Sequence, residues 1–328
     1  MSVGLVVVLL LVLAAEFTNG LTDAANAIAT VVGTRVLSPG KAVLMAAVLN
    51  MVGVLVTGTT VATTIGTDIV RPEVITIEVV GAAMVTVVSW TIAAWYFGIP
   101  TSETHEMLAG LAGAGLAWAG PSVLLWDGWR KVIIGLGMST ILGFGLGFGL
   151  MLAIYWMFHR ANRAWARRLF GRLQIVSAAF VAFSHGSNDG QKFMGVFSLA
   201  LFLAGVFPSF QIPLWVVLLC GTVMAIGTGL GGWRIIRTMG VNLTRLEPVN
   251  GFAAETAASA AILLASRFGV PLSTTHTIGT AIMGVGATRR LNAVNWGISR
   301  QIVTTWLLTF PACFVLGYGF TWLFKLIF

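Results

Sequence analysis

The sequence predicts an all-α integral membrane protein with about ten transmembrane segments in two inverted repeats, on three observations. The 328 residues are 57% hydrophobic and only 9% charged, whereas a soluble domain carries about 25% charged residues. The apolar stretches are long enough for helical spans and lack the alternating pattern of β-barrel strands. Two polar motifs each occur twice, about half the chain apart.

The apolar stretches place the spans in order. In the first half they lie at 2–34, 41–67, 73–97, 101–119 and 130–158, and in the second at 174–207, 211–232, 248–268, 271–288 and 298–326. The first and sixth exceed the length that a span requires and carry the motifs with aspartate, so we expect a break or tilt there. The fourth and ninth are short and rich in glycine, which permits full crossings or re-entrant segments at the Ser/Thr motifs.

Five crossings per half divide the chain into a first repeat at 1–158, a basic linker at 159–173 and a second repeat at 174–328. An odd number of crossings inverts the second repeat relative to the first. The positive-inside rule makes the linker cytoplasmic, because most lysines and arginines then share its side. We expect the linker to be a solvated loop, with an amphipathic segment on the membrane surface as the alternative. Its arginines are Arg160, Arg163, Arg167, Arg168 and Arg172.

The first duplicated motif places an aspartate in each over-long span. It reads NGLTDAAN at 19–26 and HGSNDGQK at 185–192. A carboxylate in an apolar span is costly unless it has a partner, and its duplication favours ion binding over helix capping. Carboxylate and amide oxygens suit a hard cation such as Na⁺, and a carboxylate can also carry H⁺. The predicted cation-site residues are Asp23, Asn26, Asn188, Asp189 and Glu255, the last being equally suited to a structural role.

The second duplicated motif offers an anion site. It reads GIPTSETH at 98–105 and GVPLSTTH at 269–276. Proline is tolerated in the first turn of a helix, and the free N–H groups of a helix N-terminus bind anions. The predicted anion-site residues are Ser102, Thr104, Ser273, Thr274, Thr275 and Lys192. Lys192 either contacts the anion or pairs with Asp189, three residues earlier on a helical face.

The histidines near these motifs carry weaker expectations. We expect His105 and His276, which close the Ser/Thr motifs, to have structural roles, and His185 offers less still. The spacing of histidines and of the two cysteines predicts no resident metal site and no disulfide. The net charge of +8 falls mostly in short loops, so it does not indicate a nucleic-acid partner.

Together the motifs resemble those of the inorganic phosphate transporter (PiT) family, over the whole chain. The family pattern Gly-Ala-Asn-Asp-x-x-Asn appears at 20–26 and in part at 186–189, and its pattern Pro-x-Ser-Thr-Thr-His appears at 271–276. The chain departs from the family at Thr22, which replaces an asparagine, and at Glu103, which replaces a small hydroxyl residue. The resemblance implies phosphate symport by alternating access, with the aspartates serving the cation and the Ser/Thr loops the phosphate.

The sequence therefore predicts a secondary active symporter of inorganic phosphate, coupled to Na⁺ or H⁺, in the plasma membrane, and not an enzyme. Its expected partners are phosphate, the coupling ion and the lipid bilayer; it needs no cofactor, and the oligomeric state stays open, a homo-oligomer included. One alternative is a sulfate permease of the same fold. Acids near the loops favour phosphate, which keeps a proton to donate at neutral pH. The other alternative, an intramembrane hydrolase, lacks an activated nucleophile.

Overall fold

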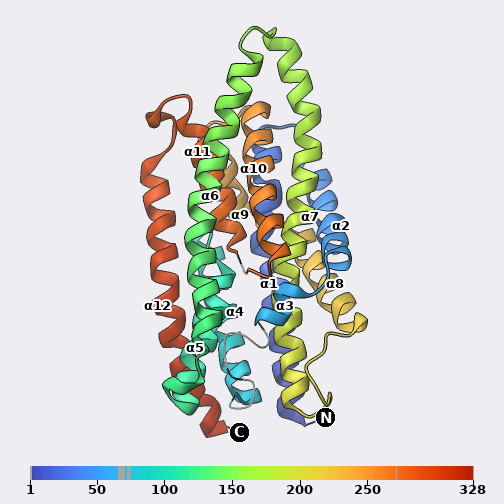
Figure 1. The fold of residues 1–328 in the computed structure, drawn as a ribbon, viewed down its shortest axis with the longest axis vertical. Coiled ribbons are helices and arrows are strands. Elements are labelled where there is room, and N and C mark those ends of the chain that lie inside the picture. The colour runs from blue at the N-terminus through green and yellow to red at the C-terminus, as the bar shows by residue number, and fades with distance from the viewer. Residues whose placement is uncertain (1, 66–70, 72–74, 271, 328) are drawn as a thin grey trace.

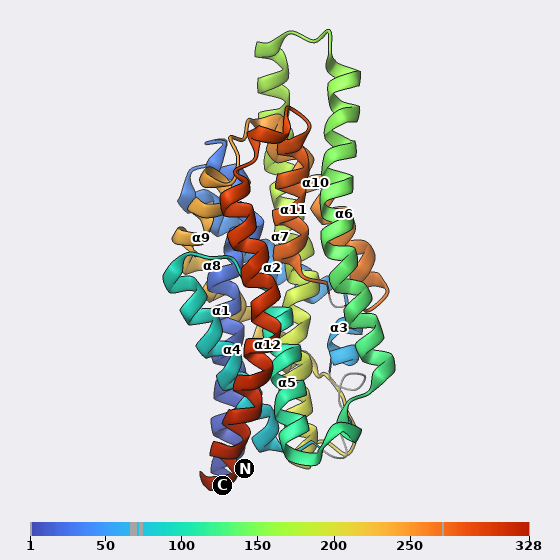
Figure 2. The ribbon, with the colours of Figure 1, turned by 90° about the vertical axis from the view of Figure 1, so that its left-hand side faces the viewer.

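The structure is a computed structural model that describes residues 2–65, 71, 75–270 and 272–327. In these ranges the chain forms a bundle of helices elongated along one axis (Figure 1). The described residues form no β-strand, and an isolated bridge joins Thr244 to Val294. Both chain ends lie at the same end of the bundle (Figures 1 and 2), as an even number of crossings would require.

Among the described residues, the second half repeats the order of elements of the first, with η3 as an addition. The first half contains α1 (Val3–Gly33), α2 (Pro39–Val56), α3 (Thr60–Thr63), α4 (Ile77–Phe97), α5 (Glu103–Ala119), η2 (Pro121–Val123) and α6 (Trp126–Phe158). The second contains α7 (Arg163–Leu203), α8 (Leu214–Leu230), α9 (Trp233–Arg237), η3 (Thr238–Asn242), α10 (Pro248–Arg267), α11 (Thr274–Ala287), η4 (Leu291–Ala293) and α12 (Trp296–Ile327). In each half a short helix and a 3₁₀ turn therefore precede a long final helix.

Six helices are long and apolar enough to cross a membrane among the residues described: α1, α2, α4, α6, α10 and α12. A seventh candidate is a broken span, in which α8 and the segment Trp233–Asn242 meet at 60°. The sequence did not predict this bend, nor α9 and η3. The predicted spans 41–67 and 73–97 extend into residues outside the described ranges. The count of ten crossings remains a prediction.

The helices of the two halves interlock. Helix α5 packs on α12 and α11 packs on α6, while α1 packs on α8 and α7 packs on α2. Figure 2 shows α5 alongside α12. The helices that carry polar motifs in one half are therefore held in place by the other half.

The expected break at the aspartate motifs is wrong, since α1 and α7 continue as helices through them. The motif glycines serve helix packing instead. A Cβ on Gly20 would lie 2.2 Å from the carbonyl oxygen of Met224, and one on Gly186 would lie 2.0 Å from that of Asn50. Each glycine thus lets a neighbouring backbone approach while its own helix stays hydrogen-bonded.

At the Ser/Thr motifs the chain does leave the helix. Helix α4 ends at Gly98 with φ of 68°, and α10 is followed by Gly269 with φ of 65°, a left-handed conformation that favours glycine. Helices α5 and α11 then begin inside the bundle with Ser102 and Ser273 as N-caps. Pro271, predicted to open the second of these helices, lies outside the described residues.

The basic linker is mostly helix rather than the expected loop. Only residues 159–162 separate α6 from α7, so four of the five linker arginines lie in the first turns of α7. The side chain of Asn162 caps α7 by accepting from the backbone N–H groups of Ala164 and Trp165, at 2.9 and 3.3 Å. The Ala- and Arg-rich residues that follow are good helix formers. The α6–α7 hairpin projects beyond the rest of the bundle (Figures 1 and 2).

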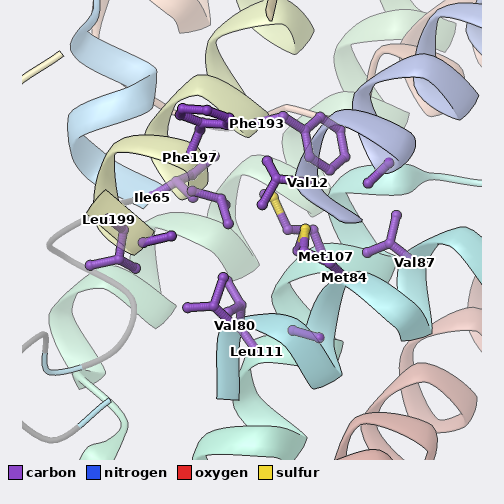
Figure 3. Close-up of a cluster of buried hydrophobic side chains, with 14 of the residues drawn as sticks. Val12, Ile65, Val80, Met84, Val87, Met107, Leu111, Phe193, Phe197 and Leu199 are labelled. Carbon is purple, nitrogen blue, oxygen red and sulfur yellow. The ribbon is translucent and has the colours of Figure 1, made fainter. Parts of the chain in front are cut away.

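Two apolar cores fill the bundle, with polar groups between them. On α1 the first core includes residues up to Ala15 and the second begins at Ala25. On α7 the order is reversed, since the second core ends at Ala182 and the first begins at Phe193. Figure 3 shows the first core, where side chains of α1, α4, α5 and α7 point toward one another. Both aspartate motifs therefore lie at one level, between two apolar regions.

Two glycines of α8 test the packing. A Cβ on Gly227 would lie 2.3 Å from the carbonyl oxygen of Phe17, whereas one on Gly229 would meet no atom within 4 Å. We expect Gly227→Ala to destabilise the protein by about 1–3 kcal/mol through overpacking. Gly229→Ala should be neutral or stabilising by up to ~1 kcal/mol, because alanine favours the helix. Thermal unfolding of both variants in detergent measures the difference, and an equal loss in both would contradict the close approach of α1 and α8.

Candidate functional site

The two aspartates meet between α1 and α7, with a histidine joining them. Nε2 of His185 lies 3.6 Å from Oδ2 of Asp23 and 3.2 Å from Oδ2 of Asp189. All three side chains are buried, and one ligand atom from each lies within 4.8 Å of the others. The sequence ranked His185 as the weakest of the histidines. Its position one helical turn before Asp189 was the signal that could have identified it.

Hydroxyl groups of α11 donate directly to these carboxylates. The Thr274 hydroxyl donates to Oδ2 of Asp189 at 2.7 Å, and the Thr275 hydroxyl donates to Oδ1 of Asp23 at 3.3 Å. The Asn26 amide donates in turn to Oγ1 of Thr275 at 2.9 Å. Residues predicted for a cation and residues predicted for an anion therefore form one network.

Lys192 connects this network to both Ser/Thr loops. Its ammonium group contacts Oδ1 of Asp189 and donates to Oγ1 of Thr104 at 2.6 Å and to the carbonyl oxygen of Leu272 at 3.1 Å. The Thr104 hydroxyl donates to the same carbonyl oxygen at 3.1 Å. Of the two alternatives for Lys192, the pairing with Asp189 is the one present here. An ammonium group has three protons, and each of them has an acceptor in this arrangement.

The serines of the two loops act as helix caps. Oγ of Ser102 accepts from the backbone N–H of His105 at 3.4 Å, and Oγ of Ser273 accepts from that of His276 at 3.2 Å. The two histidine rings meet edge to face with centroids 4.6 Å apart, and His276 stacks on Trp306 at 3.8 Å. These rings pack the first turns of α5 and α11 against each other, so two helix N-termini converge beside the aspartates.

The two departures from the family pattern are hydrogen-bonded partners. The Thr22 hydroxyl oxygen lies 2.7 Å from Oε1 of Glu103, which links α1 to the first residue of α5, and 2.8 Å from the carbonyl oxygen of Thr18. Oε2 of Glu103 is buried and has no hydrogen-bond partner among the described residues. Glu103 thus points toward α1 and the aspartate motif, where it supplies a free acceptor.

Two predicted residues belong to other networks. The Asn188 amide donates to Oγ of Ser266 at 2.9 Å. Glu255 accepts from Thr30 at 2.5 Å and from Gln174 at 3.1 Å, and it is also hydrogen-bonded by Ser177. Both carboxylate oxygens of Glu255 are therefore satisfied within its own cluster. The structure does not bring these two residues into the network of Asp23 and Asp189, and their role in cation binding remains a prediction.

A buried charged network shared by the two halves of an apolar helix bundle is typical of membrane transporters. The chain belongs to the phosphate transporter family (PHO4), whose model matches residues 19–317. It is 46% identical over 298 residues to the "Probable low-affinity inorganic phosphate transporter" of Rhizobium meliloti (strain 1021), covering 90% of this chain and 89% of that one. It is 42% identical over 317 residues to the protein with the same description in Bacillus subtilis (strain 168), covering 95% of this chain and 94% of that one.

A solved structure is similar over its full length. The solved protein is described as "The sodium-dependent phosphate transporter". It matches this chain with a TM-score of 0.87 and 26% identity, and the match covers 100% of both chains. The prediction of the family from the motifs is confirmed, as is that of a transporter rather than an enzyme. The descriptions of these relatives give no support to the hydrolase or to the sulfate permease.

The Asp189–Lys192 pair can be tested through stability. Asp189→Asn leaves the ammonium group of Lys192, which is 1% exposed, without its carboxylate. Removing one partner of a buried ion pair costs about 3–5 kcal/mol. We expect Asp189→Asn to lower the unfolding temperature in detergent, and the double variant Asp189→Asn/Lys192→Met to recover most of that loss. A double variant as unstable as the single one would show that the pair does not stabilise the fold.

Proposed function

We propose that the protein is a secondary active symporter that moves inorganic phosphate with a cation, Na⁺ or H⁺, across the plasma membrane by alternating access. Na⁺ has the support of the sodium-dependent structural neighbour. The observation that carries the proposal is that hydroxyl groups of α11, which were predicted to bind the anion, donate hydrogen bonds to the carboxylates of Asp23 and Asp189. A hydroxyl has one proton to donate, so it cannot serve a carboxylate and a bound anion at once.

This competition gives a physical route to coupling. When phosphate accepts the protons of Thr274 and Thr275, the two carboxylates lose hydrogen bonds in a buried region. Asp189 then keeps its contacts with Lys192 and His185, and Asp23 keeps its longer contact with His185. Since a buried carboxylate that loses hydrogen bonds becomes less stable, a cation at Asp23 and Asp189 would compensate for the lost hydroxyls. Each ligand then makes binding of the other more favourable, which is a reciprocal coupling of the two binding free energies.

Phosphate would lie at the converging first turns of α5 and α11. Ser102, Ser273 and Thr104 lie there with the backbone N–H groups, and Lys192 is held in place by Thr104. Oε2 of Glu103 offers an acceptor for the proton that phosphate keeps at neutral pH. Sulfate has no such proton, so the same carboxylate disfavours it. This asymmetry supports phosphate over the sulfate alternative.

Alternating access would come from two inverted repeats, at 1–158 and 174–328, joined by the basic segment at 159–173. The repeated order of elements supports this division, as does the position of both termini at one end of the bundle. Since α5 packs on α12 and α11 on α6, the two phosphate-binding turns would each move with a long helix of the other repeat.

Transport assays test the proposal. Proteoliposomes should take up labelled phosphate but not labelled sulfate, driven by a Na⁺ or a H⁺ gradient applied separately. Asp23→Asn should abolish gradient-driven uptake because it removes the charge at the cation site. Thr275→Val should raise the half-saturating phosphate concentration by about ten- to a hundredfold, the effect of losing one charge-assisted hydrogen bond.

The matched control is Thr222→Val on α8, an exposed threonine whose hydroxyl donates to the carbonyl oxygen of Leu218. It should leave uptake unchanged. Wild-type protein that moves no phosphate under either gradient would refute the symporter. Normal coupled uptake by Asp23→Asn would refute the assignment of the aspartates to the cation.

Labelling from the two sides of the membrane tests the topology. Helix α6 has 33 residues and is about 50 Å long at 1.5 Å per residue, so it can span the bilayer between Leu125 and the hairpin that carries Trp165. Cysteines at these two positions, in a chain without Cys220 and Cys313, should react from opposite sides. We expect position 165 to be cytoplasmic. Reaction of both positions from one side would contradict the ten-crossing arrangement.

A further inference from the structure

Two buried polar side chains of α1 stay outside the network described above. Glu16 and Asn19 are both 0% exposed. Neither carboxylate oxygen of Glu16 and neither amide atom of Asn19 has a hydrogen-bond partner among the described residues. An ionised carboxylate and an amide without partners are each costly inside a membrane protein. The sequence analysis assigned neither residue to a site.

Helical periodicity places both side chains on the face of α1 that carries Asp23. Glu16, Asn19 and Asp23 are spaced three and four residues apart, which brings their side chains onto one stripe. Glu16 lies about 10 Å along the helix from Asp23, at 1.5 Å per residue. Helix α1 packs against α7, the helix that carries Asp189 and Lys192.

The lysine of the neighbouring network does not neutralise Glu16, whose carboxylate oxygens have no partner among the described residues. Lys192 is held by Asp189, Thr104 and the carbonyl oxygen of Leu272. Ser198, further along α7 in the direction of the same bundle end, is another buried side chain without a partner among the described residues.

We propose that Glu16 and Asn19 form a second cation site, which binds a monovalent alkali cation such as Na⁺. This inference rests on the proposed cation-coupled symport and adds a site to it. One carboxylate and one amide oxygen supply hard oxygen ligands and a single negative charge, which one monovalent ion neutralises. A proton would satisfy one carboxylate oxygen and leave both polar atoms of Asn19 without partners.

The position of this site indicates its role. Val12 lies one helical turn from Glu16, on the side away from Asp23, and belongs to the apolar core that Figure 3 shows together with Phe193 and Phe197 of α7. That core separates Glu16 from the bundle end where the termini lie. A cation at Glu16 would thus be held between an apolar barrier and the aspartates, on the line along α1 that leads to Asp23.

Binding of Na⁺ to the purified protein tests this site without transport. We would measure the rise in unfolding temperature with Na⁺ concentration in detergent, with N-methylglucamine as the replacement ion, because a ligand that binds the folded state stabilises it. Glu16→Gln, which keeps the shape and removes the charge, should raise the half-saturating Na⁺ concentration about tenfold, which corresponds to ~1.4 kcal/mol. Asn19→Leu should act in the same direction. Glu78→Gln, a partly exposed carboxylate on α4, is the matched control and should have no effect.

A second pair of variants separates this site from the aspartates. In an Asp23→Asn background some stabilisation by Na⁺ should remain, and Glu16→Gln should remove it. An unchanged Na⁺ response in Glu16→Gln would overturn the inference, and so would stabilisation that follows pH and not Na⁺. Failure of the wild-type protein to transport phosphate would refute the symporter alone, since the binding measurement requires no phosphate.

Discussion

The structure depends on keeping a cluster of charges stable inside an apolar bundle. The cluster consists of four buried side chains: Asp23, Asp189, His185 and Lys192. His185 contacts both carboxylates, and Lys192 pairs with that of Asp189. Isolated charges there would be costly, so the helices that carry them must stay together. Because α1 and α7 carry these charges and hydroxyls of α11 donate to the two carboxylates, the charge requirement fixes the relative positions of the elements that form the candidate site.

Close backbone contact makes this arrangement possible. The glycines of the aspartate motifs let α1 approach α8 and let α7 approach α2, at positions where any side chain would collide with a carbonyl oxygen. Helices without breaks then hold each carboxylate at a defined height, while α5 and α11 begin beside them. The two continuous helices α1 and α7 therefore lie next to the N-termini of α5 and α11. This arrangement can bring a cation and an anion together.

The pairing of Thr22 with Glu103 explains why this chain tolerates both departures from the family pattern. A carboxylate at the first residue of α5 is stabilised by the helix dipole, but its negative charge repels a bound anion. The Thr22 hydroxyl holds one oxygen of Glu103 and leaves the other as an acceptor. The contact between Thr22 and Glu103 therefore links α1 to α5 through the two positions at which this chain departs from the family pattern.

The sequence by itself determined the membrane class, the family and the residue types of the site, because composition, hydrophobic length and duplicated motifs are local properties of the chain. It could not determine that the aspartates remain in unbroken helices, since the same glycine that would permit a break also permits a close contact, and only the neighbouring helix decides between them. Nor could it assign His185 or separate Glu255 from Asp23. Those outcomes depend on which side chains meet across α1, α7, α10 and α11, and contact between distant segments arises only when the bundle packs.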